Sequence, residues 1–400
     1  MTRLLLTYVL LATCCMLAAC DNDQPWQRGE IDGYAPIYSA DPMLKQISFQ
    51  SPRKTVNGGK LFTAGTNVLQ EEADSGLHII SYQDPAHPVK TGFLRIPGFQ
   101  VAAIEGDYLY ANNYNDLIII SLKALSTNMT VGRLADVWKQ PDYPVEAGAY
   151  FECVDHSKGV VVGWRRAKIK NPQCRRQQLI GDGPGDGENT RNNPGLVVSN
   201  GKLYLVNLDF VMMYSLVSPM QPVIAEARNV AGKLVDSIFL FRGNLAIIWY
   251  NGFLDLYDTA RLDDAGYYNS ASECEKYFSV GDTIAYAIPN RYNCNQGTYL
   301  TQYELRRDTN AIIRSGELEV GITGGLVQSG QYLYLASDIG LVTVNIAGPT
   351  PVKVGQLNDG RYQDIVVNGN LLFLHGREQV VCYSIATSPV SPTLISKLPY

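Results

Sequence analysis

Short apolar segments alternate with polar turns along most of the chain, and the alternation has a period. A glycine followed by an apolar or aromatic segment recurs at Gly59, Gly106, Gly201, Gly243, Gly330 and Gly369, with weaker copies at Gly159 and Gly281. The mean spacing of these glycines is about 44 residues, which matches the period of about 40–45 residues in propeller repeats. The pattern predicts repeated β-structure, with helices at most a minor component.

Each repeat predicts four short strands. An apolar run such as Gln100–Ile104 precedes the glycine, and pairs such as Asn200-Gly201 favour a tight hairpin because both turn residues can take positive φ. A third strand, such as Asp116–Ile120, follows the second. A proline turn, such as Asp84–Pro88, leads to a fourth strand, such as Val89–Leu94. Four antiparallel strands make one propeller blade.

The expected fold is therefore all-β, a β-propeller of four-stranded antiparallel blades. The number of repeats favours eight blades, and seven blades result if the poorly matching unit at Gly159 is a long insertion. Residues Lys45–Phe49 resemble a fourth strand and are a candidate to complete the last blade, which would close the ring.

The repeat also carries a family resemblance. Its fullest form combines Gly-x-Tyr-Leu-Tyr, as at Gly330–Tyr334, with Gly-Leu-x-Ile-Ile at Gly76–Ile80 and Asp-Pro-x-x-Pro at Asp84–Pro88. This pattern resembles the LVIVD-type propeller repeat of bacterial and archaeal surface proteins. The resemblance covers residues 43–400 and implies a cell-surface propeller. It implies no catalytic motif that could be transferred to this chain.

The N-terminal residues follow a different pattern. Arg3 precedes an apolar run that ends at Ala19, which is the order of a secretory signal peptide and is short for a membrane span of about 20 residues. The sequence Leu-Ala-Ala-Cys at 17–20 resembles the lipobox of bacterial lipoproteins, which implies cleavage before Cys20 and acylation of that residue. An ordinary signal peptide cleaved near Ala19 is the alternative. We predict a signal peptide at 1–19, a lipidated polar tether at 20–42 and the propeller at 43–400.

A multiply acylated Cys20 would hold the protein on a membrane without a spanning helix. Asp21 resembles the inner-membrane retention signal of enteric bacteria, whereas an acidic run after the cysteine resembles the surface-export signal of Bacteroidetes. The expected location is the bacterial cell envelope, with the inner membrane, the outer membrane and the cell surface left open.

Charge and chemistry narrow the function. The chain has 33 basic and 38 acidic residues, a net charge of −5, which argues against nucleic-acid binding because that requires concentrated positive charge. The four histidines, His78, His87, His156 and His375, lack the i, i+4 spacing of a helical metal pair. The sequence contains no Gly-x-Ser-x-Gly elbow, no phosphate loop and no dinucleotide-binding fingerprint. The prediction is no cofactor, no metal and no assigned catalytic residue, and a non-catalytic protein is favoured.

Cysteines predict two cross-links. In an oxidising compartment, Cys153 with Cys174 and Cys274 with Cys294 would each close a loop of about twenty residues, worth about 3 kcal/mol in the chain-entropy model. Cys382 lies in an apolar run and is expected to be a buried, unpaired residue.

Two segments depart from the repeat. Residues 165–194 read as a long loop whose first part is basic, and a braced docking loop for an acidic partner or lipid headgroups is one interpretation, a solvated insertion the other. Its candidate docking residues are Arg165, Arg166, Lys168, Lys170, Arg175 and Arg176. Residues Leu262–Cys294 read as a tyrosine-rich extension, either a recognition surface or ordinary packing.

The favoured function is a membrane-anchored envelope lipoprotein whose propeller is a non-catalytic interaction or scaffold module. Its partner would be another envelope protein or a cell-surface glycan. The alternative is an enzyme or small-molecule-binding protein that uses the central channel. Ionisable residues clustered at one mouth with shifted pKa values would favour that alternative, and an exposed apolar patch would favour the module.

Overall fold

The structure is a computed structural model. It describes residues 29–39, 43–126, 128–138, 142–144, 146, 148–176, 195–207, 210–230, 235–241, 243–249, 253–269, 275–280, 284–289, 298–306 and 311–400. They belong to two compact units, one within Met1–Ala40 and Pro141–Arg191 and the other within Asp41–Gln140 and Asn192–Tyr400. No described residue lies in a helix long and apolar enough to cross a membrane.

The second unit consists of seven antiparallel sheets in the described part of the chain. In each sheet four strands follow one another outward, and the first sheet has a short fifth strand, Ser48–Gln50, at its outer edge. The first three blades are β3 (Gly58–Ala64), β4 (Asn67–Glu72), β5 (Gly76–Ser81) and β6 (Val89–Arg95); β7 (Ala102–Glu105), β8 (Tyr108–Asn113), β9 (Asp116–Ser121) and β10 (Val131–Leu134); and β14 (Gly195–Ser199), β15 (Lys202–Val206), β16 (Phe210–Ser215) and β17 (Val223–Asn229).

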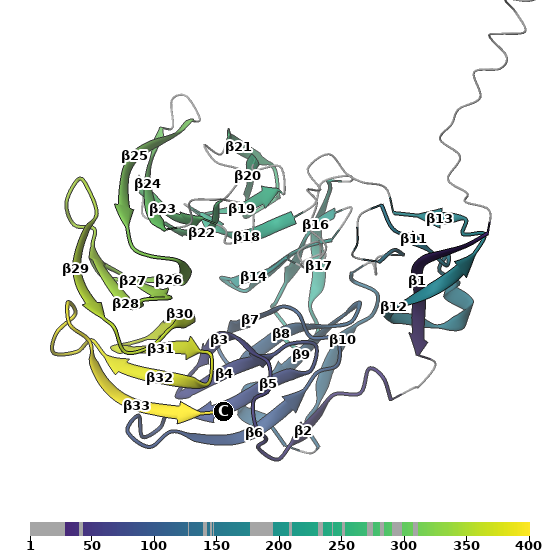
Figure 1. The fold of residues 1–400 in the computed structure, drawn as a ribbon, viewed down its shortest axis with the longest axis horizontal. Coiled ribbons are helices and arrows are strands. Elements are labelled where there is room, and N and C mark those ends of the chain that lie inside the picture. Colours follow the sequence, from purple (N-terminus) through teal and green to yellow (C-terminus); the bar gives the residue numbers. More distant parts are fainter. Residues whose placement is uncertain are drawn as a thin grey trace, which may run out of the picture. The chain divides into compact units, whose positions relative to one another are not determined.

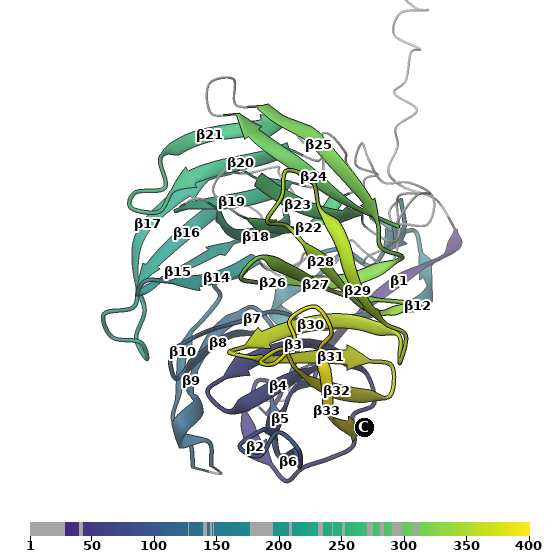
Figure 2. The same ribbon diagram turned by 90° about the vertical axis from the view of Figure 1, so that its left-hand side faces the viewer.

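The fourth and fifth blades are β18 (Val235–Phe241), β19 (Asn244–Trp249), β20 (Phe253–Asp258) and β21 (Asp264–Asn269); and β22 (Glu275–Val280), β23 (Ile284–Pro289), β24 (Tyr299–Arg306) and β25 (Ala311–Glu319). The last two are β26 (Thr323–Ser329), β27 (Tyr332–Ser337), β28 (Gly340–Asn345) and β29 (Val352–Leu357); and β30 (Tyr362–Asn368), β31 (Leu371–Gly376), β32 (Gln379–Ser384) and β33 (Thr393–Pro399). Figure 2 shows the strands of the fourth blade, β18 to β21, side by side in this order.

The innermost strands close a ring. Each of β3, β7, β14, β18, β22, β26 and β30 contacts the next, and β30 contacts β3 (Figure 1). Apolar clusters fill the spaces between neighbouring blades, for example Leu109 and Ile118 with Leu69. This confirms the all-β propeller with four-stranded antiparallel blades. Among the described residues the propeller has seven blades, so the favoured prediction of eight is wrong and the alternative of seven is right. The repeat at Gly159 does not form a blade because it lies in the first unit.

The ring closes without strand exchange, which corrects the role expected for Lys45–Phe49. The short strand β2 (Ser48–Gln50) pairs with β6, the outer strand of the first blade, while the last blade takes all four strands from its own repeat. Lys45 bonds through Nζ to Asp116 Oδ1 at 2.8 Å, in the second blade. The junction of the first and last blades is instead filled by side chains from both, including Leu61, Val68 and Phe373.

The proline turns have a packing role. In six blades the pairing of the last two strands shifts register, so the outer strand carries a β-bulge. The turn of the following blade approaches the outer strand at a small residue, both beside such a bulge, as at Gly355, and on β10, whose pairing has no register shift, as at Gly132. A Cβ on Gly132 would lie 2.5 Å from Met220 O, and one on Gly355 would lie 2.1 Å from Val390 O. Ser396 Oγ donates to Pro85 O at 2.7 Å. The turn therefore joins neighbouring blades.

The first unit contains one sheet, in the order β12 (Val160–Lys170), β1 (Glu30–Ser39), β11 (Tyr150–Phe151) and β13 (Cys174–Arg175). β1 pairs antiparallel with β12 along its whole length and parallel with β11. Two short 3-10 helices, η1 (Leu122–Ala124) and η2 (His156–Lys158), complete the described elements. Two boundary predictions are corrected: residues 30–39, assigned to the tether, form a strand, and the range 43–400 contains part of a second unit.

Candidate functional site

The six predicted docking residues lie on two strands of the first unit. Arg165, Arg166, Lys168 and Lys170 are on β12, whereas Arg175 is on β13 and Arg176 follows it. The expectation of a loop is therefore wrong for residues 165–170. The strand is hard to predict because its partner, β1, lies more than a hundred residues earlier in the chain, in a segment whose composition is typical of a tether.

Side chains alternate between the two faces of β12. Arg166, Lys168 and Lys170 stand on one face, and each lies opposite a residue of β1, in the pairs Arg166–Tyr34, Lys168–Asp32 and Lys170–Glu30. Lys168 Nζ lies 2.9 Å from Asp32 Oδ1. Arg165 stands on the other face and is exposed. One face of the sheet thus carries an acidic row on β1 beside a basic row on β12.

Three of the six basic residues make contacts within the first unit. Arg166 Nε donates to Tyr34 Oη at 3.4 Å, and its guanidinium lies 3.8 Å from Glu146. The guanidinium of Arg175 lies over the Tyr150 ring, at 5.1 Å from its centroid. Arg176 is buried and donates to Pro144 O at 3.3 Å. Arg175 and Arg176 therefore stabilise the unit, which leaves the basic row of β12 as the exposed feature.

Of the two predicted disulfides, the one between Cys153 and Cys174 is confirmed, with a Cα–Cα distance of 5.3 Å. It closes the chain between β11 and β13, which pair as Phe151 with Cys174. Cys274 and Cys294 lie outside the described residues, as does Cys20. Cys382 is buried and unpaired, as expected.

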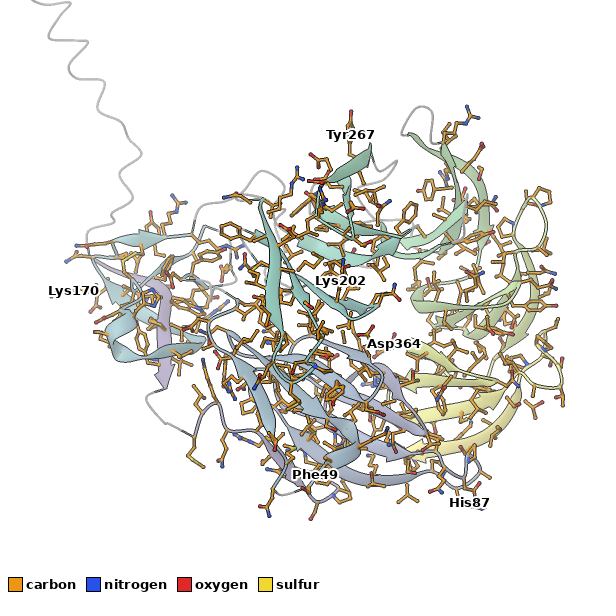
Figure 3. All side chains as sticks on the ribbon, turned by 180° about the vertical axis from the view of Figure 1, so that it is seen from behind. Phe49, His87, Lys170, Lys202, Tyr267 and Asp364 are labelled. Atoms are coloured by element: carbon orange, nitrogen blue, oxygen red, sulfur yellow. A yellow bond between two sulfur atoms is a disulfide. The ribbon has the colours of Figure 1, made fainter. Side chains whose placement is uncertain are left out.

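The tyrosine-rich segment is not an extension: its described parts form β21, β22 and β23, with Tyr286 buried and Tyr267 exposed (Figure 3).

The histidines fall into two pairs of different character. His87 and His156 are exposed and pair with Asp84 and Asp142. His78 and His375 are buried on neighbouring blades, the first and the last. Within the described residues no group of three His, Cys, Asp or Glu side chains could hold a metal ion.

A polar cluster surrounds the two buried histidines, and we call it the closure cluster: Thr55, Gln70, Glu72, His78, Asp364 and His375. Glu72 accepts hydrogen bonds from Val56 N at 3.1 Å and Asn57 N at 3.0 Å. His78 Nε2 lies 2.8 Å from Glu72 Oε2, and a carboxylate only accepts, so Nε2 carries the proton. Burial alone would raise the pKa of Glu72, but His78 and these backbone N–H groups hold it below its ordinary value.

The last blade contributes the other half of the closure cluster. Asp364 accepts a hydrogen bond from Leu61 N at 2.7 Å, across the junction between β30 and β3. Burial raises the pKa of Asp364 to about 6, against the effect of that bond. His375, its cross-strand neighbour, has a pKa that burial lowers to about 4. Figure 3 shows Asp364 within the second unit, on the inner side of its blades.

Sequence reasoning missed the closure cluster. Glu72 lies in the mixed strand Asn-Val-Leu-Gln-Glu-Glu and Asp364 precedes an apolar run; they share no motif, and the partner of Asp364, Leu61, comes from the other end of the propeller. The one available signal is a polar residue in or beside an apolar run, at His78 and Asp364. A buried polar residue requires a hydrogen-bond partner, and that requirement points to a contact between blades.

Comparison with known proteins supports the fold. No protein-family model matches the chain, and no curated protein matches it in sequence. Among solved structures, it is similar to the β-propeller domain of Cps50 (Swd1) from Myceliophteria thermophila. The TM-score is 0.50 at 10% identity, over 84% of this chain and 99% of that one. The β-propeller fold is shared.

Two further structures give the same degree of similarity. The computationally designed protein Ika8 aligns with a TM-score of 0.51 at 6% identity, over 87% of this chain and 88% of that one. PorZ, a bacterial surface component of the type-IX secretion system of Porphyromonas gingivalis, aligns with a TM-score of 0.51 at 9% identity, over 88% of this chain and 39% of that one. At such identities the likeness concerns the fold alone.

Proposed function

We propose that this protein is a lipid-anchored interaction module of the bacterial cell envelope. The observation that carries the proposal is that each blade makes specific contacts with its neighbours. Turns dock on outer strands, as Val390 does on Gly355, and buried side chains close the ring. A rigid ring of this kind presents fixed surfaces at little entropic cost on binding. The proposed location rests on the resemblance of residues 17–20 to a lipobox and of the repeat to the LVIVD type.

An exposed apolar hairpin supports the interaction role. Val217, Val223 and Ile224 lie in and after the turn between β16 and β17, and Val217 is 95% exposed. The corresponding strand starts of the first and sixth blades read Val89-Lys90 and Val352-Lys353. The third blade therefore carries isoleucine where the other two carry lysine. Contiguous exposed apolar residues are typical of interaction surfaces.

The anchor is tested by membrane fractionation. Replacing Cys20 with serine removes the acylated thiol, so the Cys20→Ser variant should move from the membrane to the soluble envelope fraction, because stable anchoring needs more than one acyl chain. Cys382→Ser is the matched control because that thiol is buried, and it should remain with the membrane. Retention of Cys20→Ser on the membrane would contradict the proposed anchor.

The closure cluster is the observation that favours the alternative, a small-molecule site or active site. It gathers ionisable groups whose pKa values are shifted, among them Asp364 and His375. Asp364 is committed to the Leu61 N–H, and Glu72 to two backbone N–H groups and His78. The Asp364 bond joins the last blade to the first, and the Glu72 bonds fix the segment before β3, so we propose the structural role. Metabolite and glycan screens on the wild type and Asp364→Asn would test the alternative; a ligand lost in the variant would support it.

A further inference from the structure

The outer edge of β12 has no paired strand among the described residues. β12 stands at one end of the sheet order of the first unit, and among described residues only β1 pairs with it. An open edge presents backbone N–H and C=O groups that can pair with a further strand. At 11 residues, β12 is the longest strand in the described structure, and Lys170 lies at its end, at the margin of the first unit (Figure 3).

Acidic side chains of β1 and basic side chains of β12 face each other across the two strands. On one face, β1 carries Glu30 and Asp32, and β12 carries Lys170 and Lys168 directly opposite them. Opposite charges facing each other across strands are favourable, and like charges are not. On this face Arg166, Lys168 and Lys170 are all exposed; Lys168 pairs with Asp32 and Arg166 lies 3.8 Å from Glu146, whereas Lys170 has no ion pair among the described residues. A strand added beyond β12 would therefore meet a row of exposed cations.

From this geometry we infer that β12 binds an extended segment of a partner protein that carries acidic residues at every second position. The segment adds to the sheet as a strand, and its acidic side chains fall on the face that holds Arg166, Lys168 and Lys170. The charge rows then read acidic, basic, acidic across β1, β12 and the partner. The inference deepens the proposed interaction module and rests on it, because it names the docking edge and the chemistry of the partner.

The same arrangement disfavours two other occupants. A second copy of this chain would place a basic row against a basic row, which repels. A membrane of anionic headgroups is a flat surface, so it would meet Glu30 and Asp32 on β1 together with the lysines of β12. Only a strand at the edge contacts the basic row by itself.

The test measures peptide binding to the full-length chain carrying Cys20→Ser, which lacks the acyl anchor. The probe is a labelled peptide of the length of β12, 11 residues, in which glutamate alternates with threonine. A control peptide of the same composition has its glutamates grouped at one end. We expect the alternating peptide to bind more tightly, with binding that weakens as salt rises, and to slow hydrogen exchange of the β12 amides.

Three variants locate the site. The double variant Lys168→Gln, Lys170→Gln should weaken binding of the alternating peptide by about fivefold or more, since each exposed ion pair contributes modestly and two are removed together. Arg165→Gln, on the opposite face of β12, and Lys158→Gln, in η2, should each change it by less than about twofold.

Equal binding of the two peptides, or binding without protection of the β12 amides, would overturn the inference. So would a stronger association with phosphatidylglycerol vesicles that is lost in the double variant, because the basic row would then serve a lipid surface. These outcomes leave the fractionation of Cys20→Ser unaffected, so failure of the docking edge and failure of the anchored module can be told apart.

Discussion

At the scale of single residues, buried polar side chains bind the segment before β3 to the first blade. Glu72 binds two backbone N–H groups of the segment before β3, and His78 supports the same carboxylate. Thr55 donates to Gln70 at 3.1 Å inside the same cluster. Charged hydrogen bonds of this kind are about twice as strong as neutral ones. The cluster fixes a segment whose own residues are mostly exposed.

Asp364 and His375 predict opposing effects of pH on stability. The folded pKa of His375 is about 4, below its ordinary 6.5, so its contribution to stability is present above pH 6.5 and is lost as the pH falls toward 4. The folded pKa of Asp364 is about 6, above its ordinary 3.8, so stability falls as the pH rises from 3.8 to 6.

Variants separate the two effects. The free energy of unfolding, measured by denaturant titration between pH 4 and 7, should fall less on acidification in His375→Gln than in the wild type. It should fall more steeply in Asp364→Asn, because the opposing carboxyl is gone. Profiles of both variants that run parallel to the wild type would show that neither residue titrates in this range.

A glycine on an outer strand gives a second residue-scale prediction. A Cβ on residue 355 would lie 2.1 Å from Val390 O, a backbone atom of the next blade. Gly355→Ala should therefore lower the free energy of unfolding by about 1–3 kcal/mol, the usual cost of overpacking. Gly348→Ala is the control, since its Cβ would meet nothing nearer than Thr350 O at 3.8 Å. Equal stability of the two variants would show that the turn does not dock as described.

At the scale of elements, the sequence predicts what is local and repeated. The hairpins at Asn200-Gly201 and the proline turns follow from residue chemistry within a few positions, and they define the blades. β1 and β12 are not predicted because each has its partner in a distant segment, and β1 contains Gly33 and Pro36, which are typical of loops. The same reason explains the blade count, since the Val-Val-Val run after Gly159 fits either a blade or another sheet.

The disulfide of the first unit should act on that unit. Cys153 and Cys174 are separated by 21 positions, and a loop of this length corresponds to about 3 kcal/mol in the chain-entropy model. The double variant Cys153→Ser, Cys174→Ser should lose that protection in the first unit, seen as faster hydrogen exchange in β1 and β12. Exchange in the blade strands should stay unchanged. Faster exchange throughout the propeller would contradict two independently stable units.

At the scale of the whole molecule, the closed ring and the small sheet have different roles in this account. The propeller is rigid because neighbouring blades contact one another repeatedly, and its closure depends on contacts between β3 and β30, such as the bond from Leu61 N to Asp364, rather than on an exchanged strand. The small sheet has a charged edge at β12 that no other described strand covers. Cys20, in the N-terminal segment before β1, would hold both on a membrane.

The most direct test of the interaction module is cross-linking and capture in intact cells, with the lipidated wild type as bait and Cys20→Ser and Lys168→Gln, Lys170→Gln as parallel baits. We predict one recurrent envelope protein with the wild type, reduced by the double variant and absent when the anchor is lost. Recovery of no specific protein with the wild type, under conditions that cross-link a known envelope complex, would contradict the account.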